Sequence, residues 1–350
     1  MMEIFCIGVF SLELLAIFYL LIGKSRIPKS QDGDQIAAIS FVIPFHNEQD
    51  RILPLIQAIN ASDYSGKCEF VFVDDYSTDD TVQILQDQIE VPYRFTKNQD
   101  KRGKKRAIHK GVMAAKYKFI ITWDADINFK PDYIQNLFDL PAADLIVLPV
   151  RMTSSKLAGK LASIEFSFIE TFNLGFSGFR KPIACNGANL GFKKSTFLAL
   201  RKLRTDYDIP SGDDLFLLWA MLKSEKEISI YKNKSFAVST EAPATFLDVI
   251  KQRKRWKGKM KSPVNFETAL PVILRFLVMM ASGFAIILGI QQPLFFLLFL
   301  LKFVIELMAS WSFIKQQYSH FFLLILHQVW YPLYALVLVG IPFRKEERWT

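Results

Sequence analysis

Cysteine is scarce in this chain of 350 residues. Its three cysteines, Cys6, Cys68 and Cys185, lie far apart and do not have the spacing of metal ligands. Cysteines placed in this way indicate neither a disulfide framework nor a zinc site. We therefore expect the soluble part of the chain to be cytosolic.

A nucleic-acid-binding motif is also missing, although the net charge is +9 and the isoelectric point is about 9.3. Several basic clusters stand beside apolar segments, which favours a membrane surface over nucleic acid as the partner. Hydrophobic residues make up 51% of the chain and include 32 phenylalanines. This composition predicts a membrane protein whose soluble portion is large enough for one core.

The first apolar run, residues 4–22, has no small-residue cleavage site after it and contains one acid, Glu13. It is about long enough to cross a bilayer, so we predict an anchor over residues 1–23. Three cations follow it: Lys24, Arg26 and Lys29. By the positive-inside rule they place the next segment in the cytoplasm. A signal peptide is the alternative, and it would export that segment.

Strand and helix patterns alternate after a polar linker. Apolar runs predict strands at residues 39–44, 70–75, 93–95 and 119–123. Helical spacing predicts a first helix capped by Asn47, with Ile52, Leu55, Ile56 and Ile59 facing inward. A second helix, capped by Ser77 or Thr78, has Val82 and Leu85 facing inward. A third helix follows a basic loop and has Ala107, Ile108, Gly111 and Ala114 facing inward. Such repeated units predict a doubly wound parallel sheet with right-handed crossovers.

The strand at residues 119–123 ends in two carboxylates, Asp124 and Asp126. Open α/β sheets bind ligands beyond the carboxyl ends of their strands, and carboxylates are suitable ligands for Mg²⁺ or Mn²⁺. Taken alone, two acids after a strand are more often loop residues or helix caps. The rest of the chain therefore has to decide between these interpretations.

A set of motifs occurs in a fixed order: Val42-Ile43-Pro44-Phe45-His46-Asn47-Glu48, Val73-Asp74-Asp75-Tyr76-Ser77-Thr78-Asp79, Gly103-Lys104, Asp124-Ala125-Asp126, Cys185-Asn186-Gly187-Ala188-Asn189-Leu190-Gly191-Phe192, Gly212-Asp213-Asp214-Leu215 and Gln252-Arg253-Lys254-Arg255-Trp256. Over about residues 39–258 this set resembles the family 2 glycosyltransferases of the GT-A fold. The resemblance implies an α/β domain, at residues 31–262, that binds a nucleotide sugar.

The resemblance also implies roles for single residues. Asp126 would be the direct metal ligand, and Asp124 would contact the metal or the ribose. Asp75 would bind the nucleobase, while the nucleotide pocket would be lined by Pro44, Phe45, Glu48 and Lys104. Two alternatives stay open, because Glu48 could be an acid in the first turn of a helix and Lys104 could lie on a solvated face.

Asp214 is the candidate general base, by its match to the second acid of the family's Glu-Asp pair. Here the sequence departs from the family pattern, because Asp213 stands in place of glutamate, which puts the role of the first acid in doubt. An alternative comes from the spacing of Ser211 and Asp214, which fits a helix capping box. The two interpretations are compatible, because a helix N-terminus also keeps a carboxylate ionised.

The match at residues 252–256 implies an acceptor or diphosphate site. Trp256 offers a flat surface for a sugar ring, and Gln252, Arg253 and Arg255 can bind polar groups or phosphate. Upstream, four apolar residues recur at helical spacing: Leu157, Leu161, Ile164 and Phe168. Their helix either packs in the core or forms a membrane-proximal platform for the acceptor.

We predict a C-terminal membrane region over residues 263–343, with segments at 269–290, 293–313 and 321–341. Two spans would keep the last cations in the cytoplasm, whereas three would place them outside. Within the second segment, Lys302 and Glu306 are spaced to neutralise one another.

Together these features predict a membrane-anchored, multi-pass, inverting glycosyltransferase that uses Mg²⁺ or Mn²⁺, at a bacterial inner membrane. The expected partners are a UDP-sugar or another nucleoside diphosphate sugar, a glycan or lipid-linked acceptor, and membrane lipid. The alternatives are a single-transfer enzyme instead of a processive synthase, and an inactive scaffold that keeps the fold. A nucleotidyltransferase is disfavoured, because Pro44-Phe45-His46-Asn47 stands where its glycine-rich loop would be.

Overall fold

The computed structural model describes residues 1–27, 33–99, 101–201, 203–204, 206, 209, 212–259, 266–314 and 322–327. The chain divides into two compact units. We call them the sheet unit, which comprises Pro28–Ser154 and Ala184–Ala242, and the helical unit, which comprises Met1–Ile27, Ser155–Ile183 and the described part of Pro243–Phe343. Each unit is made of segments that are separate in the sequence. The domain boundaries predicted at residues 31 and 262 therefore remain predictions.

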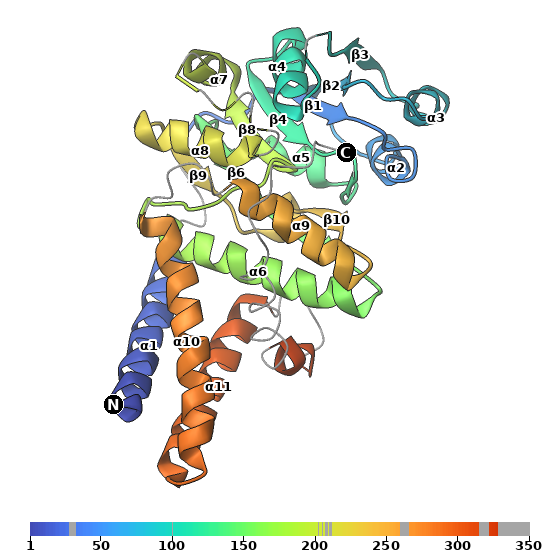
Figure 1. Ribbon diagram of the computed structural model, residues 1–350. Coiled ribbons are helices and arrows are strands. Elements are labelled where there is room, and N and C mark those ends of the chain that lie inside the picture. The colour runs from blue at the N-terminus through green and yellow to red at the C-terminus, as the bar shows by residue number, and fades with distance from the viewer. Residues whose placement is uncertain are drawn as a thin grey trace. The chain divides into compact units, whose positions relative to one another are not determined.

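The sheet unit contains a seven-stranded mixed sheet in the order β3-β2-β1-β4-β8-β6-β9 (Figure 1). Its strands are β1 (Ala38–Phe45), β2 (Lys67–Asp74), β3 (Tyr93–Lys97), β4 (Phe119–Trp123), β6 (Leu145–Val147), β8 (Asn189–Lys193) and β9 (Ile228–Ile230). Strands β3, β2, β1 and β4 are parallel, and β8 is antiparallel to both β4 and β6. A three-stranded sheet is formed by β5 (Ile127–Asn128), β10 (Val238–Glu241) and β7 (Val150–Thr153).

The sequence explains why β1 and β4 are central. Both are continuous apolar runs rich in β-branched and aromatic residues, and such strands are stable when both of their faces are covered. Phe41 of β1 stacks on Trp123 of β4 with ring centroids 4.0 Å apart. The predicted α/β class is confirmed, and the four predicted strands are present. The sheet is mixed and not wholly parallel, because β8 runs antiparallel to β4 and β6.

Helices of the sheet unit are α2 (Leu53–Asn60), α3 (Thr81–Gln88), α4 (Lys104–Ala114), α5 (Tyr133–Leu137), α7 (Lys194–Arg201) and α8 (Asp213–Lys223), with a 3-10 helix, η1, at Lys234–Phe236. Helix α4 packs closely on β1 and β2 at Gly111. A Cβ atom at Gly111 would lie 2.4 Å from the side chain of Val42, so a larger residue would push the helix off the sheet.

Two predicted helix starts are wrong. Asn47 does not cap α2, which begins at Leu53; it has a positive φ of 53° and its side-chain oxygen accepts a hydrogen bond from the Thr78 amide at 2.8 Å. Helix α3 begins at Thr81 after Asp80, and not after Ser77 or Thr78. The physical reason is shared, because these short polar side chains form hydrogen bonds between the two loops that follow β1 and β2.

The helical unit consists of α1 (Met2–Arg26), α6 (Leu157–Ser177), α9 (Phe246–Lys259), α10 (Phe266–Gly289) and α11 (Pro293–Ile314). The predicted helix at residues 157–168 is thus present, with Leu161 and Ile164 buried and Leu157 exposed. Helix α1 packs on α10 through a cluster made of Cys6, Val9, Phe10, Val278, Ala281 and Ala285. Helices α1 and α6 approach so closely that a Cβ atom at Gly23 would lie 1.8 Å from the carbonyl oxygen of Gly175.

Charged residues occupy the interior of this helix group. Lys302 Nζ lies 2.6 Å from Glu306 Oε2, which confirms the predicted pair. The structure adds Glu13 of α1, whose Oε2 lies 3.9 Å from the same ammonium group, and Ser282 of α10, which accepts a hydrogen bond from it at 3.4 Å. These charges therefore connect three helices that are far apart in the sequence.

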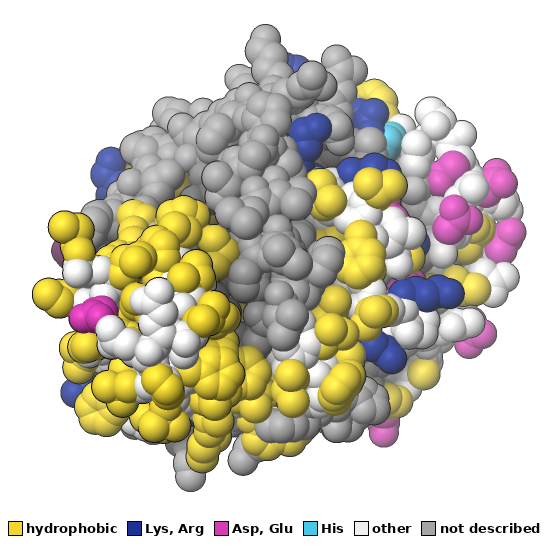
Figure 2. Space-filling model, turned by 60° about the horizontal axis from the view of Figure 1, so that its bottom comes forward, with side chains coloured by type: hydrophobic (Ala, Val, Ile, Leu, Met, Phe, Trp, Pro, Cys, Tyr) yellow, Lys and Arg dark blue, Asp and Glu magenta, His cyan; other side chains and the backbone are white. Residues whose placement is uncertain are grey.

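In the described part of the chain, one helix, Met2–Arg26, is long and apolar enough to cross a membrane. Helices α10 and α11 coincide with the predicted segments at 269–290 and 293–313. Residues 328–341 of the third segment lie outside the described residues. Figure 2 shows a broad area of hydrophobic side chains, and the exposed large hydrophobic residues of the helical unit include Ile7, Leu15, Phe18, Ile287, Leu297 and Leu301.

Candidate active site

The carboxyl ends of three parallel strands meet at one edge of the large sheet. Phe45 at the end of β1 is paired with Asp74 at the end of β2, and Val42 is paired with Thr122 of β4. Continuing the second register by two residues brings Asp124 level with Pro44. The acids that follow β2 and β4 are therefore neighbours at this edge, where open α/β sheets bind their ligands.

Lys104 reaches this edge from the first turn of α4. Its Nζ lies 2.6 Å from Asp124 Oδ1 and 3.8 Å from Asp213 Oδ2. Burial disfavours the charge of Lys104, but the two carboxylates outweigh burial and raise its pKa above the ordinary lysine value. The side chain is 16% exposed, so the interpretation of Lys104 as part of a solvated face is wrong.

A second group of charges surrounds Asp126. Arg51 lies 2.8 Å from Glu48 and 3.9 Å from Asp126, and Thr240 of β10 donates a hydrogen bond to Asp126 at 3.2 Å. Burial raises the pKa of Glu48 to about 7; Arg51 opposes this shift, whereas Asp126 and Asp124 add to it. Glu48 precedes the start of α2 by several residues, so it is not an acid of that helix's first turn.

Asp75 is fully buried beside the end of β2. Its carboxylate accepts hydrogen bonds from the Gly103 amide at 2.8 Å and from the Asn98 side chain at 2.5 Å. Burial raises the pKa of Asp75, and these two hydrogen bonds oppose the rise. Pro44 is buried nearby, and the ring of Phe45 lies in the core, 6.4 Å from that of Phe95.

Asp213 and Asp214 begin α8, immediately after Gly212. Gly212 has a φ of 83°, a left-handed conformation that glycine adopts without strain. Asp214 accepts hydrogen bonds from the Gly187 amide at 3.3 Å and from the Leu215 amide at 2.7 Å. Ser211 lies outside the described residues, and Gly212 occupies the N-cap position, so the observed helix start differs from the predicted capping box.

Gly187 allows the acid pair to lie this close to the strand ends. A Cβ atom at this position would lie 2.7 Å from Asp213 Oδ2, which is closer than real Cβ contacts. The turn that contains Gly187 leads directly into β8, where Leu190 is paired with Thr122 of β4. Any side chain at position 187 would therefore displace Asp213 or the turn.

The predicted residues at 252–256 belong to α9 and so to the helical unit. Arg253 donates to Glu165 Oε2 from two nitrogens, at 3.1 and 2.9 Å, and to Gln252 Oε1 at 2.6 Å. Its guanidinium lies 4.1 Å from the centre of the Trp256 ring. Arg253 is buried by these contacts, whereas Arg255 is exposed.

The chemistry of the strand-end cluster fits a divalent cation. We use this name for Glu48, Arg51, Lys104, Asp124, Asp126, Asp213 and Asp214, in which carboxylates outnumber cations. Their mutual repulsion contributes to the raised pKa of Glu48. The described residues contain no group of three or more side chains that could hold a metal ion alone. Two carboxylates are nevertheless sufficient for Mg²⁺ or Mn²⁺ when substrate phosphates and water supply the other ligands.

Arg51, a member of the strand-end cluster, and Thr240, which contacts it, were not predicted. Arg51 stands three positions after Glu48, and this spacing was a usable signal for an ion pair. Thr240 comes from a strand 114 positions beyond Asp126, and no local pattern could have indicated the contact.

The fold and these groups together define the class of protein. It is an α/β protein with a mixed sheet, whose strand ends present carboxylates and a lysine. A structure similar to the chain is "Mannosyltransferase PcManGT from Pyrobaculum calidifontis in complex with GDP-Man and Mn2+". The similarity has a TM-score of 0.60 at 14% identity and covers 97% of this chain and 99% of that one. At this identity the comparison shows the fold, which is of the GT-A type.

The sequence comparisons also find similar proteins. Residues 40–199 match the model of the glycosyl transferase family 2. Poly-beta-1,6-N-acetyl-D-glucosamine synthase from Staphylococcus epidermidis is 25% identical over 241 residues, which are 67% of this chain and 57% of that protein. The synthase of the same name from Staphylococcus aureus is 27% identical over 140 residues, 38% of this chain and 34% of that protein. The matches thus span between 34% and 57% of these relatives' length.

Proposed function

We propose that this protein transfers a sugar from a nucleoside diphosphate sugar to an acceptor hydroxyl, with inversion at the anomeric carbon. The observation that carries the proposal is Lys104, held between Asp124 and Asp213 at the strand ends of a domain that matches the glycosyl transferase family 2 model. A lysine at this place can approach a phosphate on one side and remain fixed by carboxylates on the other.

The donor site needs positive charge, because the leaving diphosphate develops negative charge as the glycosidic bond breaks. Asp126 and Asp124 would hold Mg²⁺ or Mn²⁺, which supplies that charge when bound. Lys104 would bind the same phosphates from α4. Asp75 would accept a hydrogen bond from the nucleobase, in a pocket whose walls include Pro44 and Glu48. Phe45, whose ring is fully buried in the core, would pack behind these walls.

The acceptor hydroxyl is a weak nucleophile and needs a base. Asp214 would accept its proton, because the first turn of α8 favours the ionised carboxylate and the Gly187 amide fixes its orientation. Asp213 is the next candidate, and its contact with Lys104 favours a role in holding the donor side of the site.

The acceptor is proposed to be a growing glycan or a lipid-linked sugar. Gln252, Arg255 and Trp256 would form its site or contact the diphosphate, and Arg255 is exposed. Arg253, which is buried against Glu165, would instead hold these residues in place. The names of the relatives favour a polysaccharide product. A UDP-sugar is the proposed donor. A single transfer to a lipid acceptor is the alternative.

The membrane arrangement is part of the proposal. Helix α1 anchors the chain, and α10 and α11 cross or enter the same bilayer, which is proposed to be a bacterial inner membrane. Lys24 and Arg26 at the end of α1 favour a cytoplasmic location for the sheet unit, where nucleotide sugars would be available. The proposal keeps the predicted division into an anchor at 1–23, a catalytic domain at 31–262 and a membrane region at 263–343.

The test is nucleotide release from a panel of donors. Purified protein in lipid vesicles is incubated with Mn²⁺ and single nucleotide sugars, and free nucleoside diphosphate is measured. We expect release with one donor, loss of release in Lys104→Met, and retention in Lys110→Met, which changes a partly exposed lysine of the same helix. Absence of release with every donor would favour the alternative, a scaffold without enzymatic activity.

A further inference from the structure

Lys105 follows Lys104 in α4 but points to a different partner. Consecutive helix residues lie about 100° apart around the axis, so the two ammonium groups diverge. Lys105 Nζ lies 2.7 Å from Asp206 Oδ2 and donates to the Asp206 carbonyl oxygen at 2.8 Å. Its side chain is 4% exposed. A buried ammonium group is costly and is also unfavourable at a helix N-terminus, so Lys105 needs a specific partner to stay charged.

Asp206 is that partner, and it is shared. Arg204 donates to the same carboxylate from Nε at 2.9 Å and from Nη2 at 2.7 Å. Burial opposes the charge of Asp206, but the hydrogen bonds and charges of Arg204 and Lys105 outweigh it and lower the pKa of this carboxyl group. We call these three residues, Lys105, Arg204 and Asp206, the Asp206 bridge.

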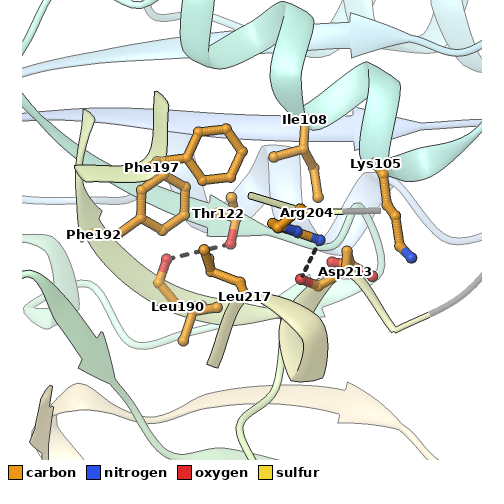
Figure 3. A pocket seen from close by; sticks show the side chains of 9 residues that line it. All are labelled: Lys105, Ile108, Thr122, Leu190, Phe192, Phe197, Arg204, Asp213 and Leu217. Carbon is orange, nitrogen blue, oxygen red and sulfur yellow. Dashed lines mark hydrogen bonds between the residues drawn. The ribbon is translucent and has the colours of Figure 1, made fainter. Parts of the chain in front are cut away.

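The Asp206 bridge contacts the first turn of α8 at two points. Arg204 Nη2 donates to the carbonyl oxygen of Asp213 at 3.4 Å, a hydrogen bond drawn in Figure 3. Lys105 Nζ lies 4.4 Å from the centre of the Phe216 ring, within cation–π range. The bridge therefore connects the start of α4, which carries Lys104, to the start of α8, which carries Asp213 and Asp214.

The cavity that the described residues form beside the bridge is too small for a substrate. Lys105, Arg204 and Asp213 border a small cavity whose other walls include Ile108, Phe192 and Leu217 (Figure 3). The cavity has room for roughly one water molecule, which is far too little for a nucleotide or a sugar. Any effect of the bridge on transfer must therefore pass through the elements that it connects.

We infer that Lys105, Arg204 and Asp206 are positioning residues, which fix the first turn of α8 against α4 and thereby hold Asp214 in place relative to the donor site. The inference rests on the proposed function, in which Asp214 is the base and Lys104 binds the donor. Catalysis depends steeply on the placement of the base, and a displacement of about 1 Å can cost about a hundredfold in rate. Donor binding, which uses other residues, depends less on this placement.

Lys105→Met is the decisive variant. Methionine fills similar space, and the loss of one cation leaves Arg204 and Asp206 as a neutral pair, so this variant is expected to fold. We expect kcat to fall by about tenfold to a hundredfold while donor affinity, measured by calorimetry, is unchanged. Lys105→Arg restores the charge and should recover most of the rate. Lys110→Met in the same helix should behave as wild type.

Hydrogen–deuterium exchange provides a readout that does not require activity. In Lys105→Met, amides at residues 212–217 should exchange faster, while those of β4 should not change. Wild-type exchange at the start of α8, or a wild-type kcat, would overturn the inference. A parallel loss of donor affinity and melting temperature, without recovery in Lys105→Arg, would show a general structural role instead. If the wild type releases no nucleoside diphosphate, the proposed function fails, and the exchange experiment still decides whether the bridge fixes α8.

Discussion

The strand-end cluster and the ionic groups of the helical unit both combine carboxylates with cations, but they differ in contact with solvent. Asp124 is 32% exposed and Asp126 is 26% exposed, and the Arg51 side chain beside them is half exposed. In the helical unit, Lys302, Glu13 and Glu306 are all buried, and so is Arg253 against Glu165. The first set can exchange partners with a ligand, whereas the second is enclosed by its own helices.

This difference separates two uses of charge. Enclosed ion pairs contribute little net stability, but removal of one partner leaves an uncompensated charge and is destabilising. Charged groups that keep contact with water have a smaller desolvation penalty, and they remain available to bind a ligand. We therefore expect variants of the strand-end cluster to change chemistry and binding, and variants of the enclosed pairs to change stability.

The largest effect is expected for Asp214→Asn. Asparagine keeps the shape and the capacity to accept the Gly187 hydrogen bond, so donor binding and melting temperature should stay near wild type. The single-turnover rate of transfer should fall by about a hundredfold or more, as expected for loss of a positioned base. Asp139→Asn, which changes an exposed acid, is the control. Transfer at nearly the wild-type rate would leave Asp213 as the next acid to test.

A smaller effect, on stability, is expected for Glu165→Gln. This change leaves the buried guanidinium of Arg253 without a counter-charge and should cost about 2 kcal/mol in the free energy of unfolding. The melting temperature in detergent should fall accordingly. The double variant Glu165→Leu with Arg253→Met removes both charges and should recover part of that loss. If Glu165→Gln melts like wild type, the pair does not hold α9 on α6.

The smallest effect concerns the pH dependence set by Glu48. Its pKa is raised from 4.5 to about 7, so the folded protein binds a proton that the unfolded chain has released in this interval. The stabilising contribution is therefore complete below about pH 4.5 and is lost as pH rises through about 7. The slope of unfolding free energy is at most about 1.4 kcal/mol per pH unit for one proton.

Glu48→Gln should abolish this part of the slope between pH 4.5 and 7 in chelator-treated protein. Glu90→Gln, at an exposed position, is the control and should leave the slope unchanged. An identical slope in wild type and Glu48→Gln would show that Glu48 titrates as an ordinary carboxyl group.

Sequence reasoning located the strands and their acids because local patterns carry that information. A continuous apolar run that ends at Asp124 indicates a buried strand wherever its neighbours lie. Helix starts were harder to predict. Asn47 and Ser77 form hydrogen bonds between two loops, but a short polar residue that caps a helix looks the same in the sequence.

Contacts between distant segments could not be predicted. Asp206 lies 101 positions from Lys105, and Glu165 lies 88 positions from Arg253. Neither acid belongs to a motif, and each is recognisable only after the fold brings it to its cation. The same limit explains why α6 and α9, which lie within the predicted catalytic domain, are part of the helical unit.

The central claim is that the accessible carboxylates at the strand ends hold a metal for the donor, and donor binding with and without Mn²⁺ tests it most directly. Calorimetry should show that Mn²⁺ strengthens binding of the nucleotide sugar to wild type but has little effect on Asp126→Asn. Equal affinities without metal would show that the variant keeps its fold and its other donor contacts. If Mn²⁺ strengthens donor binding equally in both proteins, Asp126 is not a ligand and the account of this cluster is contradicted.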